Sequence, residues 1–277
     1  MYRGYQLAFS VEDFSSQEYL DLYKQQGEDI MSSKKHEVQE TLKSFVLSDG
    51  KTIDGSKLKE NWFPQVEVDI FISHSHRDED LAIALAGWLW DTYRITSFID
   101  SYLWGYSNDL LRIIDDNYCF QNAKGTYSYE KRNYSTSHVH MMLSVALSQM
   151  IDNAECLFFL NTPNSITPDS IINTTESPWI YSEIMTSQLI RKKGLTTYRT
   201  IALNEGQRTF SKGGKMPRFQ YELPTAHLTS INAHDLVKWE ECWSKEIHNI
   251  QYPKYSKDLR THALDILYYL TKQQNEQ

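Results

Sequence analysis

Short apolar runs alternate with helical patterns through the middle of the chain. Residues 66–72, 95–99 and 155–160 each form a mainly apolar run of strand length. Between the first two runs, apolar positions recur every three or four residues up to Tyr93, which predicts a helix, and a second helix is expected over about 179–193. Strands that alternate with helices predict an α/β fold with a mainly parallel sheet.

The segments on either side are more polar. Near the start, Ser15 or Ser16 can cap a helix, because apolar side chains recur after them at helical spacing. Residues 198–203 predict a fourth strand, and 259–270 predict a final amphipathic helix. We therefore expect three parts: a helical N-terminal extension (1–65), a main α/β domain (66–205) and a C-terminal extension (206–277) that ends in the amphipathic helix.

Composition narrows the class of protein. A net charge of −8 over 277 residues argues against a nucleic-acid groove, which needs clustered Lys and Arg. No apolar run approaches the roughly 18 residues of a membrane span, and residues 1–4 lack the apolar core of a secretion signal. The three cysteines are widely spaced without a metal-type pair, so we expect reduced thiols and no metal site. These features predict a cytoplasmic protein that binds neither nucleic acid nor membrane.

Polar residues follow the first two predicted strands. Ser73, His74 and Arg77 lie between a strand and a helix, where amides and a guanidinium can hold an anion such as pyrophosphate. The alternative for His74 and His76 is a helix cap with surface imidazoles. Asp100 ends the second strand and can bond a ribose hydroxyl or hold the following loop, 100–105, in an Asx-type turn. In open α/β sheets, ligands bind at such strand ends.

The third predicted strand leads through a polar loop to Glu183, one helical turn after Trp179. A carboxylate at this position can act as a catalytic group, or it can be a solvated glutamate that is stabilised by the helix dipole. Trp104, Trp179 and Tyr181 offer flat aromatic faces on which a ligand ring can stack, although tryptophans also commonly pack in cores. Glu183 is therefore the main candidate for a catalytic group, with aromatic residues beside it.

Three short sequence motifs, in the same order along the chain, resemble those of the Toll/interleukin-1 receptor (TIR) domains. Residues 69–74 (DIFISH) resemble the first strand and box of that family, and Phe98-Ile99-Asp100 with Leu103 and Gly105 resembles its second strand and following loop. Ser177-x-Trp179-x-x-x-Glu183 resembles its third motif. The likeness covers roughly residues 66–205 and is closest to the TIR subunit of bacterial Thoeris antiphage systems. Two departures are Ile180, where many relatives carry cysteine, and an apparent insertion over about 117–137.

The resemblance implies a flavodoxin-like fold and an activity. In the NAD-cleaving members the glutamate of the third motif is catalytic, so Glu183 is expected to act on NAD⁺ as substrate, with no cofactor. The nicotinamide of NAD⁺ departs as a neutral molecule and needs no general acid, while a fixed anion stabilises the oxocarbenium-like ribose. The expected substrate-binding residues are Ser73, His74, Arg77, Asp100, Trp104, Trp179 and Tyr181. The chain lacks the G-x-G-x-x-G fingerprint of redox dinucleotide folds, which agrees with NAD⁺ as a consumed substrate.

The resemblance also implies a biological setting. A Thoeris TIR subunit converts NAD⁺ into an ADP-ribose-derived signal, often cyclic, that activates a separate effector, and assembly through TIR surfaces commonly completes the pocket. The alternative is a TIR-like interaction module, an adaptor that assembles with other TIR surfaces and does no chemistry. A nucleotide-binding sensor that binds without turnover is a third reading.

Overall fold

The computed structural model describes most of the chain. The described residues are 1–33, 42–46, 53–121, 125–166, 174–175, 177–199, 221–222, 225–249 and 262–274. No helix among them combines the length and the apolar character needed to cross a membrane.

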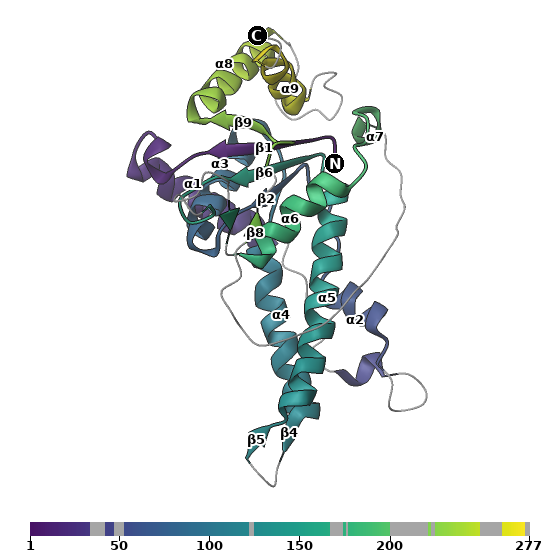
Figure 1. The fold of residues 1–277 in the computed structure, drawn as a ribbon. Helices are drawn as coiled ribbons and strands as arrows, with labels where there is room; N and C mark the ends of the chain where they lie inside the picture. The colour runs from purple at the N-terminus through teal and green to yellow at the C-terminus, as the bar shows by residue number, and fades with distance from the viewer. Residues whose placement is uncertain are drawn as a thin grey trace.

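The core of the fold is a sheet of five parallel strands in the order β3-β2-β6-β1-β9. Its strands are β1 (Arg3–Ala8), β2 (Ile70–Ser73), β3 (Ser97–Ile99), β6 (Cys156–Leu160) and β9 (Thr229–Asn232). Helices cover both faces of this sheet (Figure 1). The α/β, flavodoxin-like fold expected from the sequence is confirmed.

Nine helices in the described residues surround the sheet. They are α1 (Gln17–Ser33), α2 (Gly55–Trp62), α3 (Glu79–Tyr93), α4 (Ser101–Ile114), α5 (Tyr129–Asn153), α6 (Pro178–Leu189), α7 (Thr196–Arg199), α8 (Ala233–Asn249) and α9 (Ala263–Gln274). Alternate side chains of the strands point to two hydrophobic clusters. One cluster joins the sheet to α3, α8 and α9, and the other joins it to α2, α4, α5 and α6. Because β2 and β6 are covered on both faces, every residue of both strands is buried.

Helix α1 packs on the outer side of α3 at unusually short range. The two helices approach through Gly27 and Gly87: a Cβ atom built on Gly87 would lie 1.9 Å from the carbonyl oxygen of Tyr23, and one on Gly27 would lie 2.2 Å from that of Ile83. Backbone therefore touches backbone at this crossing, and only glycine leaves room for it. The contact attaches the N-terminal helix firmly to the sheet's own helical layer.

Helices α4 and α5 run side by side away from the sheet and form a stalk (Figure 1). A π-helical turn (Asp115–Cys119) and a small hairpin of β4 (Phe120–Gln121) and β5 (Thr126–Tyr127) close its far end. The buried Asp115 ties the two sides together, because its carboxylate accepts hydrogen bonds from Arg132 Nε at 2.8 Å and Ser135 Oγ at 2.7 Å. The apparent insertion over about 117–137 coincides with this distal end.

The N-terminal extension differs from the expectation. Residues 1–65 were expected to be helical, and α1 is indeed present, but Arg3–Ala8 forms strand β1, which lies between β6 and β9 within the sheet. The reason is non-local: β1 gains its hydrogen bonds from segments about 150 and 225 residues further along the chain, as the pairs Arg3 with Cys156 and Tyr5 with Thr229 show. The extension is therefore part of the main domain.

Two further expectations change at the C-terminal side. Tyr198 and Arg199 belong to the short helix α7 rather than to a strand, and 200–203 lie outside the described residues. The strand at the edge of the sheet is instead β9, from the predicted C-terminal extension. A separate two-stranded antiparallel sheet pairs β7 (Thr174–Thr175) with β8 (Tyr221–Glu222). The final amphipathic helix is confirmed as α9 and packs on the sheet together with α8.

Candidate functional site

The site lies where the winding of the sheet reverses direction. From β2 the chain passes to β3 on one side, and then reaches β6 on the other side of β2. Such a reversal leaves a crevice at the carboxyl ends of the two neighbouring strands, where open α/β sheets bind ligands. Ser73 and His74 lie at the end of β2, Asp100 follows β3, and both segments are fully buried there.

Helix α6 carries Glu183 to the same edge. Its start is well defined, because Ser177 Oγ accepts a hydrogen bond from the amide of Ile180 at 3.3 Å and Pro178 occupies the first helical turn. The Glu183 side chain is only 2 % exposed, and its Oε2 atom accepts a hydrogen bond of 2.6 Å from Ser73 Oγ. The alternative of a solvated glutamate at a helix start is therefore wrong.

Asp100 contacts both of the neighbouring groups. Its Oδ1 atom lies 2.9 Å from Nδ1 of His74, and both side chains are completely buried. The carboxyl groups of Asp100 and Glu183 also lie close enough for each to affect the proton affinity of the other. The expected loop over 100–105 is absent: α4 begins at Ser101, directly after Asp100. One buried polar network thus contains Ser73, Glu183, Asp100 and His74.

Burial and proximity change the proton affinities of these groups. Loss of solvation raises the pKa of Glu183 well above its usual value, and the neighbouring charge of Asp100 raises it further. Burial raises the pKa of Asp100 to about 7, although its interaction with the Glu183 carboxyl opposes the change. Burial lowers the pKa of His74, against the opposing effect of the Glu183 charge. At neutral pH the imidazole is therefore neutral.

These raised values predict how stability depends on pH. Above about pH 4 the unfolded chain has lost the protons that Asp100 and Glu183 still hold in the folded protein. The stabilisation that these protonated groups give to the folded state is therefore fully present at lower pH and disappears as the pH rises through their folded-state pKa values. We expect the free energy of unfolding to fall between about pH 4 and pH 7, by up to about 1.4 kcal/mol per pH unit for each extra proton. Urea unfolding across this range should show a shallower fall for Asp100→Asn than for wild type. The same slope in both proteins would contradict the assignment, and the exposed Glu130→Gln should leave the slope unchanged.

The other predicted site residues have different surroundings. Arg77 is exposed on the short helix His76–Asp78. Trp179 is half-buried and packs edge-on against His140 of α5, with 5.6 Å between ring centroids, so its ring contributes to the helical layer. Tyr181 is half-buried on α6, and Trp104 lies in the first turn of α4, with its side chain outside the described residues.

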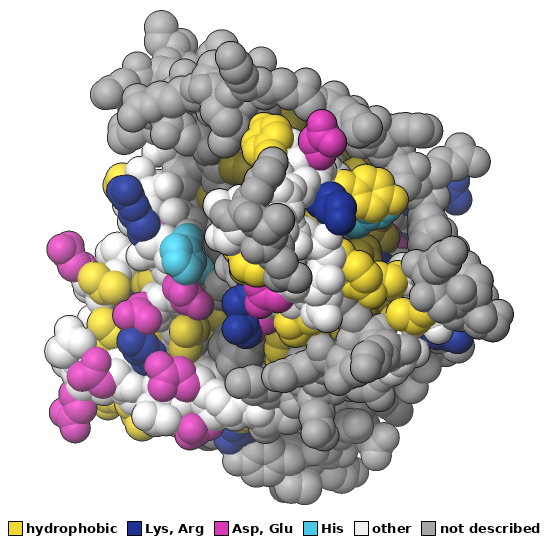
Figure 2. All heavy atoms as spheres, turned by 90° about the horizontal axis from the view of Figure 1, so that it is seen from below, with side chains coloured by type: hydrophobic (Ala, Val, Ile, Leu, Met, Phe, Trp, Pro, Cys, Tyr) yellow, Lys and Arg dark blue, Asp and Glu magenta, His cyan; other side chains and the backbone are white. Residues whose placement is uncertain are grey.

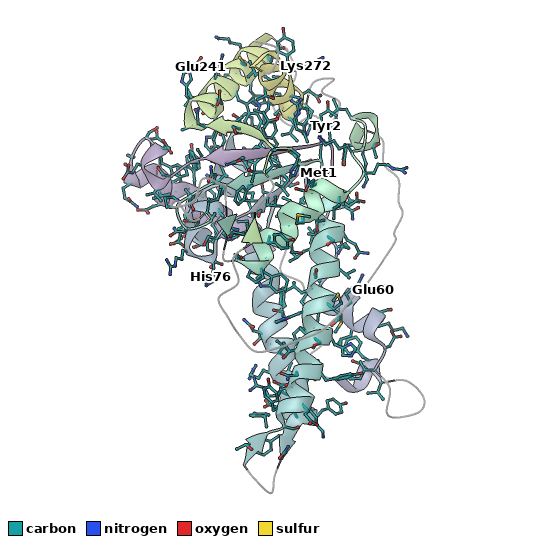
Figure 3. All side chains as sticks on the ribbon, viewed as in Figure 1. Met1, Tyr2, Glu60, His76, Glu241 and Lys272 are labelled. Atoms are coloured by element: carbon teal, nitrogen blue, oxygen red, sulfur yellow. The ribbon has the colours of Figure 1, made fainter. Side chains whose placement is uncertain are left out.

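Asp78 has a role at this edge that the sequence did not indicate. Together with Glu79 and Asp80 it was interpreted as part of a solvated helix start, yet Asp78 is buried and accepts hydrogen bonds from Thr162 and from Asn164 Nδ2 at 2.7 Å. The bonds fasten the segment after β6 to the segment after β2. No local pattern marks Thr162 or Asn164, because only the fold brings them to Asp78. His76, by contrast, lies on the outer side of the edge with a 75 % exposed side chain (Figure 3).

Other features of the described surface are separate from the site. A cavity of about 290 Å³ lies on the stalk and is lined by Asn108, Leu111, Arg112, Asp115, Asp116, Tyr127 and Arg132. In the face that Figure 2 shows, basic and acidic side chains are interspersed rather than segregated. Within the described ranges no group of three or more His, Cys, Asp or Glu side chains is placed to hold a metal ion.

Comparison of the chain with family models, with curated proteins and with solved structures gives no match. A function can therefore be proposed only from the geometry of the site and from the resemblance of its three sequence motifs to those of TIR domains.

Proposed function

We propose that the protein is a TIR-type NAD⁺ glycohydrolase or cyclase that cleaves the bond between nicotinamide and ribose, with Glu183 as the catalytic residue. The supporting observation is the meeting of the three TIR-like motifs at one point: Ser73 from the first, Asp100 from the second and Glu183 from the third lie together at the reversal of the sheet. Residues that are 110 positions apart in the sequence make a 2.6 Å hydrogen bond there.

The arrangement suits a reaction that develops positive charge. As the C1′–N bond breaks, its electron pair leaves with the pyridine nitrogen, and nicotinamide departs as a neutral molecule. The ribose then resembles an oxocarbenium ion, which a buried carboxylate stabilises more strongly than an exposed one would, because little water screens the interaction. Ser73 fixes the orientation of the Glu183 carboxyl through its short hydrogen bond. The acceptor of the ribosyl group decides whether the product is ADP-ribose, a cyclic derivative or a conjugate.

The setting of the reaction is part of the same proposal and rests on the resemblance to Thoeris TIR subunits. We place the enzyme in the cytoplasm, where its ADP-ribose-derived product acts as a signal of phage infection and reaches a separate effector. Self-association through TIR surfaces is expected. Because Ser73, His74, Asp100 and Glu183 are all buried, this edge must open before NAD⁺ can reach them.

The decisive experiment follows free nicotinamide after purified protein is mixed with NAD⁺, over a range of protein concentrations and in lysates of phage-infected cells. We expect release of nicotinamide in step with loss of NAD⁺, and mass spectrometry of the small molecules identifies the product. Saturable binding of NAD⁺ without release of nicotinamide would replace the enzyme with a nucleotide sensor. Absence of both binding and turnover under every condition would leave the TIR-like adaptor as the better reading.

A further inference from the structure

The two carboxyl groups at the centre of the site are in direct contact and away from water. Asp100 is 0 % exposed and Glu183 is 2 % exposed, and each carboxyl group affects the proton affinity of the other. Two adjacent carboxylates in a medium of low polarity repel each other strongly, so the pair retains one proton over a wide pH range.

Groups from every neighbouring element act on this pair. From β2, Ser73 Oγ donates to Oε2 of Glu183, and Nδ1 of His74 lies 2.9 Å from Oδ1 of Asp100. At the start of α4, the backbone amide of Ser101 favours the ionised form of Asp100. From the start of α3, the charge of Glu79 opposes that ionised form. Asp78 is the remaining buried acid at this edge, and it already accepts hydrogen bonds from the segment after β6.

The donors are unequally distributed over the pair. Ser73 Oγ donates a hydrogen bond to Oε2 of Glu183. The other oxygen of Glu183, Oε1, accepts no hydrogen bond from any described residue, as expected of an oxygen that carries a proton. Neither oxygen of Asp100 has a hydrogen-bond partner of good geometry among the described residues, although Nδ1 of His74 lies 2.9 Å from Oδ1. Three of the four buried carboxyl oxygens therefore have no hydrogen-bond donor of good geometry among the described residues, an arrangement that favours one proton held within the pair over two ionised groups.

We propose that Asp100 is a positioning residue that shares one proton with Glu183, so that the buried pair presents a single negative charge to the ribose. This inference rests on the proposed function and deepens it: the group that stabilises the developing cation is the pair, and His74 keeps Asp100 in place. With two protons the pair offers no charge to the cation. With none, mutual repulsion breaks the contact that orients Glu183.

The shared proton has a signature in the pH dependence of nicotinamide release. The wild-type rate should fall on the acid side, where the pair gains a second proton, and on the alkaline side, where it loses its only one. Asp100→Asn removes one titrating group and leaves an amide that donates to Glu183. That variant should lose the alkaline fall, because no second carboxylate repels Glu183, and it should keep the acid fall, because Asp100 is already protonated on that side in wild type. A merely structural Asp100 predicts a lower rate with both falls unchanged, and that result would overturn the proposal.

A second measurement tests the pair without using the reaction. Infrared difference spectra, recorded as the pH of the purified protein is raised, report the loss of protonated carboxyl groups. Wild type should show one carboxyl that stays protonated well above the usual range, and both Asp100→Asn and Glu183→Gln should move that signal to lower pH, because the remaining carboxyl is still buried but no longer shares its proton. If the signal is present while nicotinamide is never released, the pair exists and the proposed enzyme fails. If nicotinamide is released and the signal is absent, the shared proton is wrong and the enzyme stands.

Discussion

Glu183→Gln should lower the rate of nicotinamide release by at least about 100-fold, the usual loss when a preorganised electrostatic group is removed from an active site. The substitution keeps the shape of the side chain, and Ser73 can still donate to the amide oxygen, so the site retains its packing. The variant loses the Glu183 carboxyl group, which shares a proton with Asp100, and with it the negative charge that the pair presents to the ribose. The rate is measured from nicotinamide formed per molecule of protein, with saturating NAD⁺.

A matched control separates chemistry from folding. Glu240 on α8 is also partly buried, and burial raises its pKa, but it lies with the helices on the other side of the sheet. Glu240→Gln should therefore keep the wild-type rate. Thermal unfolding of both variants at neutral pH should show little loss of stability in Glu183→Gln, because the amide NH₂ can donate to Asp100 in place of the shared carboxyl proton. A Glu183→Gln protein that is folded and releases nicotinamide at the wild-type rate would remove Glu183 from the mechanism.

Gly87→Ala should destabilise the protein by about 3 kcal/mol, at the upper end of the cost of overpacking. The new methyl group would lie 1.9 Å from the carbonyl oxygen of Tyr23, and the obstacle is backbone, which cannot rotate away as a side chain can. Helix α1 would have to separate from α3, which breaks the Gly27 crossing as well. The gain in helix propensity of about 1 kcal/mol from replacing glycine does not offset this loss. Urea unfolding measures the change, and the midpoint should move to a lower concentration.

The chain contains a suitable control for this glycine. Gly55 begins α2, and a Cβ atom built there meets nothing within 4 Å. Gly55→Ala should therefore be neutral or slightly stabilising, since it restricts the unfolded chain without a clash. An equal, small effect of both substitutions would show that α1 does not pack on α3 through backbone contact.

The sequence indicated the parts of the fold that local pattern determines. The predicted strands 95–99 and 155–160 and the helix ending at Tyr93 match β3, β6 and α3. Both strands are buried along their whole length, although β3 lies at the edge of the sheet, and such strands have continuous apolar runs. The run 66–72 contains β2, although the strand begins only at Ile70. Ser73, His74, Asp100 and Glu183 were selected as strand-end or helix-start residues, and the structure brings these four together.

The remaining features depend on contacts between distant segments. Arg3–Ala8 has the mixed composition of an exposed segment, and only its pairing with β6 and β9 makes it a strand. Trp179 is one turn from Glu183, yet the crossing of α6 over α5 directs its ring to His140. The pKa values of Asp100 and Glu183 are raised chiefly because the fold buries both carboxyl groups together, away from water. Sequence spacing contains no information about such three-dimensional proximity.

The position of β1 also constrains how the protein is made. This strand leaves the ribosome well before its two neighbours in the sheet, β6 and β9, which are translated roughly 150 and 225 residues later. At typical synthesis rates of about 5–20 residues per second, the strand waits unpaired for about ten seconds or more. Pairings so distant along the chain also make closure of the sheet slow. Until then β1 has two open edges, and nascent chains are most exposed to aggregation and to chaperone binding during that interval.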